Sequence, residues 1–172
     1  MYNTKLEQFA VSIIMANRSG VLTRISSLFS QRDFNIDTFT SGETNNPKVA
    51  RITITATGDE RKKDQLLKQI SKLYDVKKVE ILKPENTILR ELLIVKIKAV
   101  DENLQTVLNA ADVFRSKVVD MSLGSVCIEM TGESAKLNAF LTYVEPYGIL
   151  EYCRTGLIAL ERGPQCLYEE EN

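Results

Sequence analysis

The pattern of apolar and polar positions divides the chain into two halves that repeat one order of elements. In some stretches apolar residues alternate with polar ones, which is the period of a strand, and in others they recur at helical spacing. The first half is expected to run strand, helix, strand, strand, helix, strand over Gln8–Met15, Val21–Arg32, Asn35–Thr40, Val49–Thr57, Asp59–Leu73 and Val76–Leu82.

The strand Val49–Thr57 has the cleanest alternation in the first half. Its small and β-branched apolar residues share one face, and Arg51 and three threonines share the other. This pattern predicts one face on a core and one face in water. The stretch that precedes it, Ser41–Lys48, contains Gly42 and Pro47 and reads as a loop.

The second half repeats the order of the first. Its elements are expected over Glu91–Val100, Leu104–Phe114, Lys117–Ser122, Val126–Thr131, a helix from Ser134 to Pro146, and Ile149–Leu160 with a possible break near Gly156. Two βαββαβ units in series predict an α+β protein with two ferredoxin-like domains, each an open sheet with helices on one face. The expected boundaries are a first domain over 7–82, a polar linker over 83–90, a second domain over 91–163 and a tail over 164–172.

The composition removes several classes of function. The chain has 172 residues, 44% of them hydrophobic and 26% charged, and its net charge is −1. That charge indicates neither a nucleic-acid partner nor a membrane partner, and no apolar run approaches the ~20 residues that span a bilayer. A cytoplasmic location is the expectation.

Histidine is absent from the sequence. This excludes Ser-His and Cys-His nucleophile pairs as well as histidine metal ligands, although carboxylate or lysine catalysis stays open. Cys127, Cys153 and Cys166 form no C-x-x-C pair, so we expect buried thiols and no metal site.

The stretch Asn17–Leu22 is the best candidate for a binding site. It joins the first strand to the first helix, and a helix start carries free backbone N–H groups and a partial positive charge. Gly20 lets a ligand approach the backbone, while Asn17 and Ser19 supply short polar side chains that cap the helix or hold the ligand. Such a pocket suits a carboxylate. The alternative is a capped turn that binds nothing.

The short strand that begins at Asn35 is predicted to lie at an edge of its sheet, where unpaired backbone groups favour pairing with another chain. If two copies pair there, Asn35 and Ile36 of one chain face the Asn17–Leu22 turn of the other. A ligand between them would couple binding to the geometry of the dimer. Alternatively, Asn35 is an ordinary turn residue after the helix.

A ferredoxin-like sheet is compatible with three classes of function, so the function must be inferred from the residues of the site. RNA recognition needs exposed aromatic side chains on the central strands, whereas this chain has Arg51, Thr53 and Thr55 there. Of the motifs that would indicate catalysis, the sequence contains no G-x-G-x-x-G, no phosphate-binding loop and no G-x-S-x-G turn. Small-ligand sensing at the glycine turn fits the sequence better than either.

These residues resemble a known family. The chain is similar to regulatory (small) subunits of acetolactate synthase, whose N-terminal domain is an ACT domain. The stretches that carry the resemblance are Asn17–Arg24, Leu28-Phe29, Arg32, Asn35-Ile36, Arg51–Thr53, Glu91–Lys96, Phe114-Arg115, Val119-Asp120, Glu129–Gly132, Lys136, Tyr147–Ile149, Glu151, Arg154–Gly156 and Arg162-Gly163.

The resemblance implies a regulatory role without catalysis by this chain. The catalytic large subunit would condense two pyruvates, or pyruvate with 2-oxobutanoate, with thiamine diphosphate, Mg²⁺ and FAD, and no cofactor belongs to this chain. The small subunit would activate it and confer feedback inhibition by valine or another branched-chain amino acid. It would form a homodimer through its ACT domains, with the effector at their interface.

The residues expected to hold the effector come from the turn and the edge strand. They are Asn17, Ser19, Gly20, Val21, Leu22, Asn35, Ile36 and, near the pocket, Gly42. We expect N–H groups near Gly20–Leu22 to take the effector carboxylate, and Asn17 and Asn35 to hold its polar ends. Val100–Asn103 replaces this turn in the second half, so no effector is assigned there.

Two other readings stay open. The chain could be a free-standing amino-acid sensor that acts on some other enzyme or on a transcription factor, or an enzyme in its own right. The sequence departs from the family pattern at Cys153, where alanine is usual, and at Ala50, where serine is usual. The second departure leaves the predicted site intact but could alter the strength of the effector.

Overall fold

The computed structural model describes residues 7–31, 34–164 and 166–167. They divide into two compact units, one made of the chain up to Ile88 together with the segment from Leu157, the other of Leu89–Gly156. Each unit has the strand and helix order that the apolar pattern predicts, so the two ferredoxin-like domains are confirmed.

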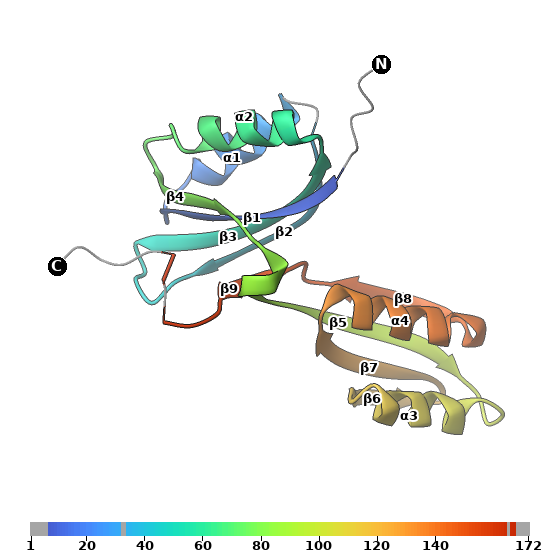
Figure 1. Cartoon of the computed structure of the whole chain (residues 1–172). Coiled ribbons are helices and arrows are strands. Elements are labelled where there is room, and N and C mark those ends of the chain that lie inside the picture. The colour runs from blue at the N-terminus through green and yellow to red at the C-terminus, as the bar shows by residue number, and fades with distance from the viewer. Residues whose placement is uncertain (1–6, 32–33, 165, 168–172) are drawn as a thin grey trace, which may run out of the picture. The chain divides into compact units, whose positions relative to one another are not determined.

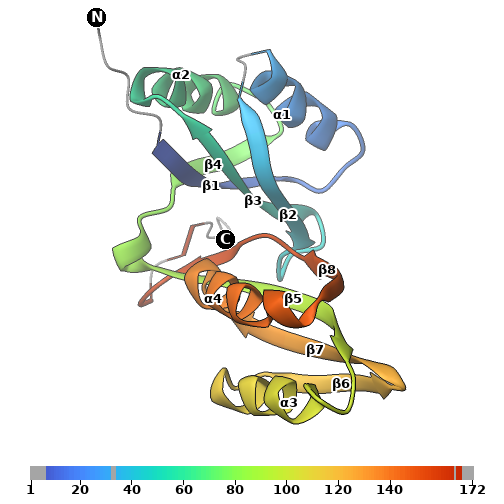
Figure 2. The same ribbon diagram turned by 90° about the vertical axis from the view of Figure 1, so that its right-hand side faces the viewer.

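The first unit is an antiparallel sheet with strand order β2-β3-β1-β4. Its strands are β1 (Glu7–Ala16), β2 (Asn35–Glu43), β3 (Val49–Gly58) and β4 (Val76–Ile81). The helices α1 (Val21–Ser30) and α2 (Glu60–Ile70) lie side by side on one face of this sheet (Figures 1 and 2).

The core of the first unit lies between the helices and the sheet. Val21, Ile25 and Phe29 are the buried residues of α1. Phe34, just before β2, packs edge-on against Phe9 and Phe29, with ring centroids 5.7 and 6.2 Å apart. This packing fixes the direction in which α1 runs back over the sheet.

The middle of the other face of β3 is not in water, contrary to the prediction, although Thr57 at its end is exposed. Thr53 and Thr55 are only 3% and 4% exposed. The segment that begins at Leu157 accounts for part of this burial, because Leu167 packs in a separate cluster with Ile14 and Val49. An alternating pattern therefore describes a strand correctly here without revealing that a distant segment returns to its polar face.

The edge strand β2 is longer than predicted. It continues to Glu43, because Gly42 pairs with Arg51 and Glu43 with Ala50, so Gly42 lies in a strand and not in a loop. Helix α1 ends at Ser30, and the predicted end at Arg32 falls outside the described residues.

The second unit has strand order β6-β7-β5-β8. Its elements are β5 (Thr87–Ala99), α3 (Leu104–Val113), β6 (Lys117–Ser122), β7 (Gly124–Gly132), α4 (Ser134–Val144) and β8 (Ile149–Arg154). β5 begins within the predicted linker, just after a 3₁₀ turn over Pro84–Asn86. The core again lies against the helices and includes Val95, Ile128 and Phe140.

The chain leaves the second unit after β8. The predicted strand Ile149–Leu160 is split, and its last part is β9 (Ile158–Glu161), which pairs with β5. β9 falls within the first unit, where the Nη1 of Arg51 donates a hydrogen bond to the carbonyl oxygen of Ala159 at 3.1 Å. Cys153 and Cys166 are exposed, so the expectation that they are buried is wrong.

Candidate effector site

The turn between β1 and α1 has backbone N–H groups for which no other backbone group of the described chain is an acceptor. Gly20 stands at the N-cap of α1 in the left-handed region, with φ 85°, and no side chain caps the helix. Among the described residues, the N–H groups of Ser19, Gly20, Val21 and Leu22 have no acceptor; the first helical bond runs from the N–H of Arg24 to the carbonyl of Gly20 at 3.2 Å. A left-handed glycine turns the chain without placing a side chain over these donors.

Neither Asn17 nor Ser19 caps helix α1 with its side chain, although the sequence predicted such a cap as one possibility. Instead, Asn17 ties the turn to the end of β2 and the loop after it. Its Nδ2 donates hydrogen bonds to the carbonyl of Pro47 at 2.9 Å and to Oε1 of Glu43 at 3.2 Å. Its backbone N–H donates to the carbonyl of Lys48 at 2.8 Å. The side chain is exposed, so it lies at the surface of the turn.

A buried carboxylate that the sequence did not single out holds the other side of the turn. Asp75 accepts hydrogen bonds from the Nη2 of Arg18 and, at 2.9 Å, from the Nη1 of Arg24. The carboxylate is 3% exposed, whereas the two arginine side chains are 58% and 66% exposed. Two guanidinium groups on one carboxylate leave an excess positive charge beside the free N–H groups, which favours an anion there.

The predicted residues of β2 lie at two different places. Gly42 is at the end of β2 next to Glu43 and therefore near Asn17. Asn35 pairs with Thr57, which in turn pairs with Gln8 at the start of β1, so Asn35 and the Gly20 turn lie at opposite ends of the sheet. One chain alone does not bring them together.

Asn35 and Ile36 also differ in surroundings. The Nδ2 of Asn35 donates to Oδ1 of Asp37 at 3.1 Å and the residue is exposed, whereas Ile36 is partly buried against the core. Since β2 is the outermost strand of its sheet, its outer backbone groups are available to a further strand.

Burial also affects Arg51, on the polar face of β3. Desolvation lowers the pKa of Arg51 below its ordinary value, while electrostatic interaction with Glu161 opposes that shift. Arginine keeps its charge throughout the physiological range, so the group acts as a fixed cation that anchors the returning segment.

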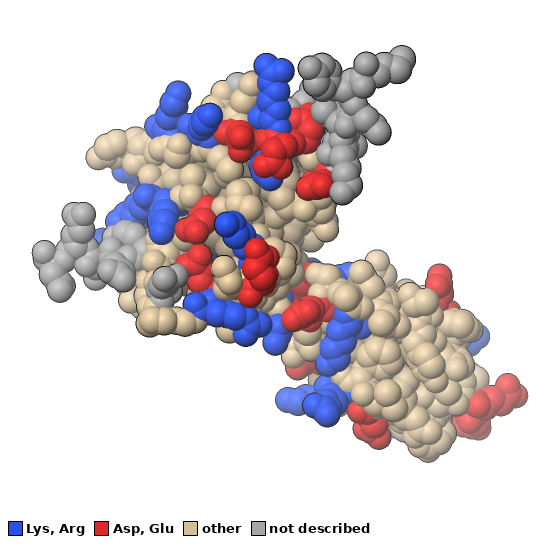
Figure 3. Space-filling model, viewed as in Figure 1, with Lys and Arg blue, Asp and Glu red and all other residues tan. Residues whose placement is uncertain are grey.

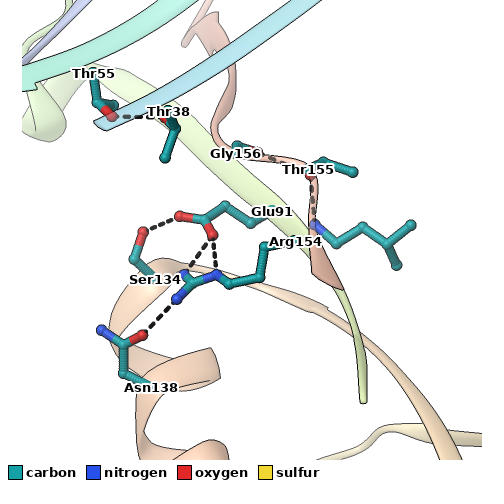
Figure 4. Close-up of polar contacts among 9 residues, drawn as sticks. Thr38, Thr55, Glu91, Ser134, Asn138, Arg154, Thr155 and Gly156 are labelled. Carbon is teal, nitrogen blue, oxygen red and sulfur yellow. Dashed lines mark hydrogen bonds and ion pairs between the residues drawn. The ribbon is translucent and has the colours of Figure 1, made fainter. Parts of the chain in front are cut away.

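The second unit contains a polar cluster around a buried carboxylate (Figure 4). Glu91 of β5 is 4% exposed and accepts hydrogen bonds from the Nε of Arg154 at 2.7 Å and from the hydroxyl of Ser134. Arg154 also donates to Oδ1 of Asn138 at 2.7 Å. The charges of Glu91 and Arg154 are therefore paired with each other, and the cluster fastens β8 and α4 to β5.

The residue after Arg154 fixes the end of β8. The N–H of Leu92 donates to the hydroxyl of Thr155 at 3.1 Å, and the N–H of Thr155 donates to the carbonyl of Leu92 at 3.1 Å. The stretch Arg154–Gly156, which carried much of the resemblance, thus has a structural role in this unit.

Over the described residues, no group of three or more His, Cys, Asp or Glu lies close enough together to hold a metal ion. No helix in that part of the chain is long and apolar enough to cross a membrane. On the face that Figure 3 shows, basic and acidic side chains are interspersed, unlike the broad basic surface that a nucleic-acid backbone requires.

Family models match both units. A model described as "AHAS small subunit-like ACT domain" matches residues 11–78, and one described as "Small subunit of acetolactate synthase" matches residues 90–163.

Individual relatives agree with these matches. A probable acetolactate synthase small subunit of Methanothermobacter thermautotrophicus is 40% identical over 91% of this chain and 94% of its own length. The acetolactate synthase small subunit of Haemophilus influenzae is 39% identical over 89% and 94%. The crystal structure of the small subunit from Thermotoga maritima superposes with a TM-score of 0.84 at 34% identity, covering 92% of this chain and 99% of that one.

Proposed function

Because the chain belongs to the family of acetolactate synthase small subunits, we propose that it senses a branched-chain amino acid, valine foremost, and regulates a catalytic large subunit. The family name itself implies a large subunit as partner. In this proposal the small subunit raises the activity of the large subunit and makes it sensitive to feedback by valine.

The observation that carries the proposal is the set of N–H groups at Ser19–Leu22 that have no acceptor in the described chain. They lie at the start of α1, where the helix dipole adds partial positive charge, and beside Arg18 and Arg24. An amino-acid carboxylate is the natural occupant of such donors. The predicted contacts of the effector with Gly20, Val21 and Leu22 follow from this.

The edge strand β2 supports the proposed homodimer. If two copies pair their β2 strands antiparallel about a twofold axis, the Asn35 end of one copy lies opposite the Glu43 end of the other. The Glu43 end is held to the turn through Asn17. Pairing of this kind would bring together the two groups of predicted site residues that one chain keeps apart.

The proposal places the chemistry on the large subunit. Thiamine diphosphate, Mg²⁺ and FAD would be bound there, and this chain would contribute no group to the condensation of two pyruvates. Its sequence contains no histidine, so the residue most often used for general acid–base catalysis is not available in this chain.

The test is reconstitution with the cognate large subunit. Formation of 2-acetolactate from pyruvate is followed for the large subunit alone, with this chain, and with this chain plus L-valine. We expect activation by the chain and inhibition by valine only when the chain is present. A chain that binds valine but leaves the large subunit unaffected would instead be a free-standing sensor, and turnover of pyruvate by this chain alone would refute a purely regulatory role.

A further inference from the structure

Hydrogen-bond donors and acceptors lie on different sides of the β1–α1 turn. On the side of α1 and β4 lie the N–H groups of Ser19–Leu22, which have no acceptor among the described residues, and the guanidinium groups of Arg18 and Arg24, whose combined charge exceeds that of Asp75. Such groups bind a carboxylate but have no lone pair to offer an ammonium group.

Acceptors gather on the side of β2. The Oε1 of Glu43 accepts a hydrogen bond from the Nδ2 of Asn17 at 3.2 Å. The other carboxylate oxygen of Glu43 and the Oδ1 of Asn17 have no partner among the described residues, and both residues are exposed. They are therefore accessible to a ligand bound at the turn.

The position of this carboxylate is fixed by the fold. Glu43 is the last residue of β2 and is paired with Ala50, while Asn17 is fastened by its bonds to the carbonyls of Pro47 and Lys48. Asn17 therefore ties the negative charge of Glu43 to the same turn whose N–H groups would take the effector carboxylate. A carboxylate held to an anion-binding turn is unfavourable unless the ligand also carries a cation.

We propose that Glu43, together with the Oδ1 of Asn17, binds the α-ammonium group of the effector, so that the turn selects a zwitterionic amino acid over a plain carboxylate. The inference deepens the proposed function and rests on it. The free N–H groups bind one charge of the amino acid and Glu43 binds the other. A 2-oxo acid with the same carbon skeleton has the carboxylate alone, and Glu43 repels it.

The experiment compares two ligands that differ only at the α-carbon. Binding of L-valine and of 3-methyl-2-oxobutanoate to the full chain is measured by isothermal titration calorimetry, for the wild type and for Glu43→Gln. The substitution keeps the size of the side chain and removes its charge. Glu85→Gln is the matched control, because Glu85 is an exposed glutamate of the same unit in the turn Pro84–Asn86.

The wild type is expected to bind valine at least about tenfold more tightly than the oxo acid, since the ammonium group of valine donates a charge-assisted hydrogen bond to Glu43 and the 2-oxo group has no hydrogen to donate. Glu43→Gln is expected to weaken valine about tenfold and to leave the oxo acid unchanged or improved, while Glu85→Gln changes neither. The ratio of the two affinities is the readout, because a purely structural effect would not move it.

Other results would overturn the inference in distinguishable ways. Equal weakening of both ligands by Glu43→Gln would mean that Glu43 only supports the turn. A wild type that binds both ligands equally would show that the ammonium group is not recognised, with the anion-binding turn left standing. A wild type that binds neither ligand would refute the proposed function itself.

Discussion

The β1–α1 turn and the β5–α3 turn occupy the same place in the same topology, but their backbone groups are used differently. In the first unit Gly20 has φ 85°, and the N–H groups of Ser19, Gly20, Val21 and Leu22 have no acceptor in the described chain. In the second, the N–H groups of Asn103 and Leu104 both donate to the carbonyl of Val100 at 2.9 Å, and the Oδ1 of Asn103 accepts from the N–H of Val100 at 2.8 Å. A few turn residues, rather than the fold, therefore determine whether such a domain offers an anion site.

The equivalence of the two units extends to their irregularities. The pairing of β2 with β3 shifts register between Ile36 and Thr38, and that of β6 with β7 shifts between Val118 and Asp120. Pairing of β1 with β4 and of β5 with β8 is likewise interrupted once in each unit. The turns thus differ within otherwise closely matched frameworks, which makes them suitable for paired mutational tests.

The largest effect is expected for the buried carboxylate of the second unit. Glu91→Ala leaves the guanidinium of Arg154 without its carboxylate partner and should lower the free energy of unfolding by about 3 kcal/mol. Urea unfolding followed by circular dichroism measures this. The control is Glu151→Ala, which removes an exposed ion pair with Lys96 and should cost less than about 1 kcal/mol. Equal losses would mean that the Glu91 cluster does not hold the unit together.

A negative charge in the β1–α1 turn should abolish most effector binding. Gly20→Asp places a carboxylate among the donors, and the repulsion should weaken valine by about 2 kcal/mol, roughly thirtyfold. Gly20→Asn is the matched control, because asparagine has the same shape, tolerates φ > 0 and carries no charge. Calorimetry on the full chain gives both affinities. Normal valine binding by Gly20→Asp would refute the assignment of this turn.

Loss of the Asn17 side chain should have a smaller effect on the same site. Asn17→Ala removes the bonds to Pro47 and Glu43, and valine should bind about 1.5 kcal/mol more weakly, roughly tenfold. The same titration measures it. If valine binds unchanged, Asn17 serves only the loop after β2.

The smallest effect is expected in the β5–α3 turn of the second unit. Asn103→Ala removes bonds to Val100 and Lys98 and should cost about 1 kcal/mol of stability, with valine affinity unchanged. Denaturant unfolding and calorimetry together test the contrast between the two turns. A change in valine affinity would show that the second turn also contributes to effector binding.

The sequence predicts the element order well because the periods of strands and helices reflect local burial. It also identifies Gly20, since a polar stretch with glycine between an apolar strand and an amphipathic helix is a local signal. Asp75 gives no such signal: its role depends on Arg18 and Arg24, which are brought to it only when β4 pairs with β1. The burial of Thr53 and Thr55 was missed because the alternation along β3 holds no information about a distant segment.

The cluster of Ile14, Val49 and Leu167 has a consequence for biosynthesis of the chain. On a ribosome that adds roughly 5–20 residues per second, the strands β1 and β3 emerge several seconds before Leu167 is made. During that interval the apolar side chains on the outer face of the first sheet lack one of their covering residues. The nascent domain should therefore interact with chaperones until translation of the segment from Leu157 is complete.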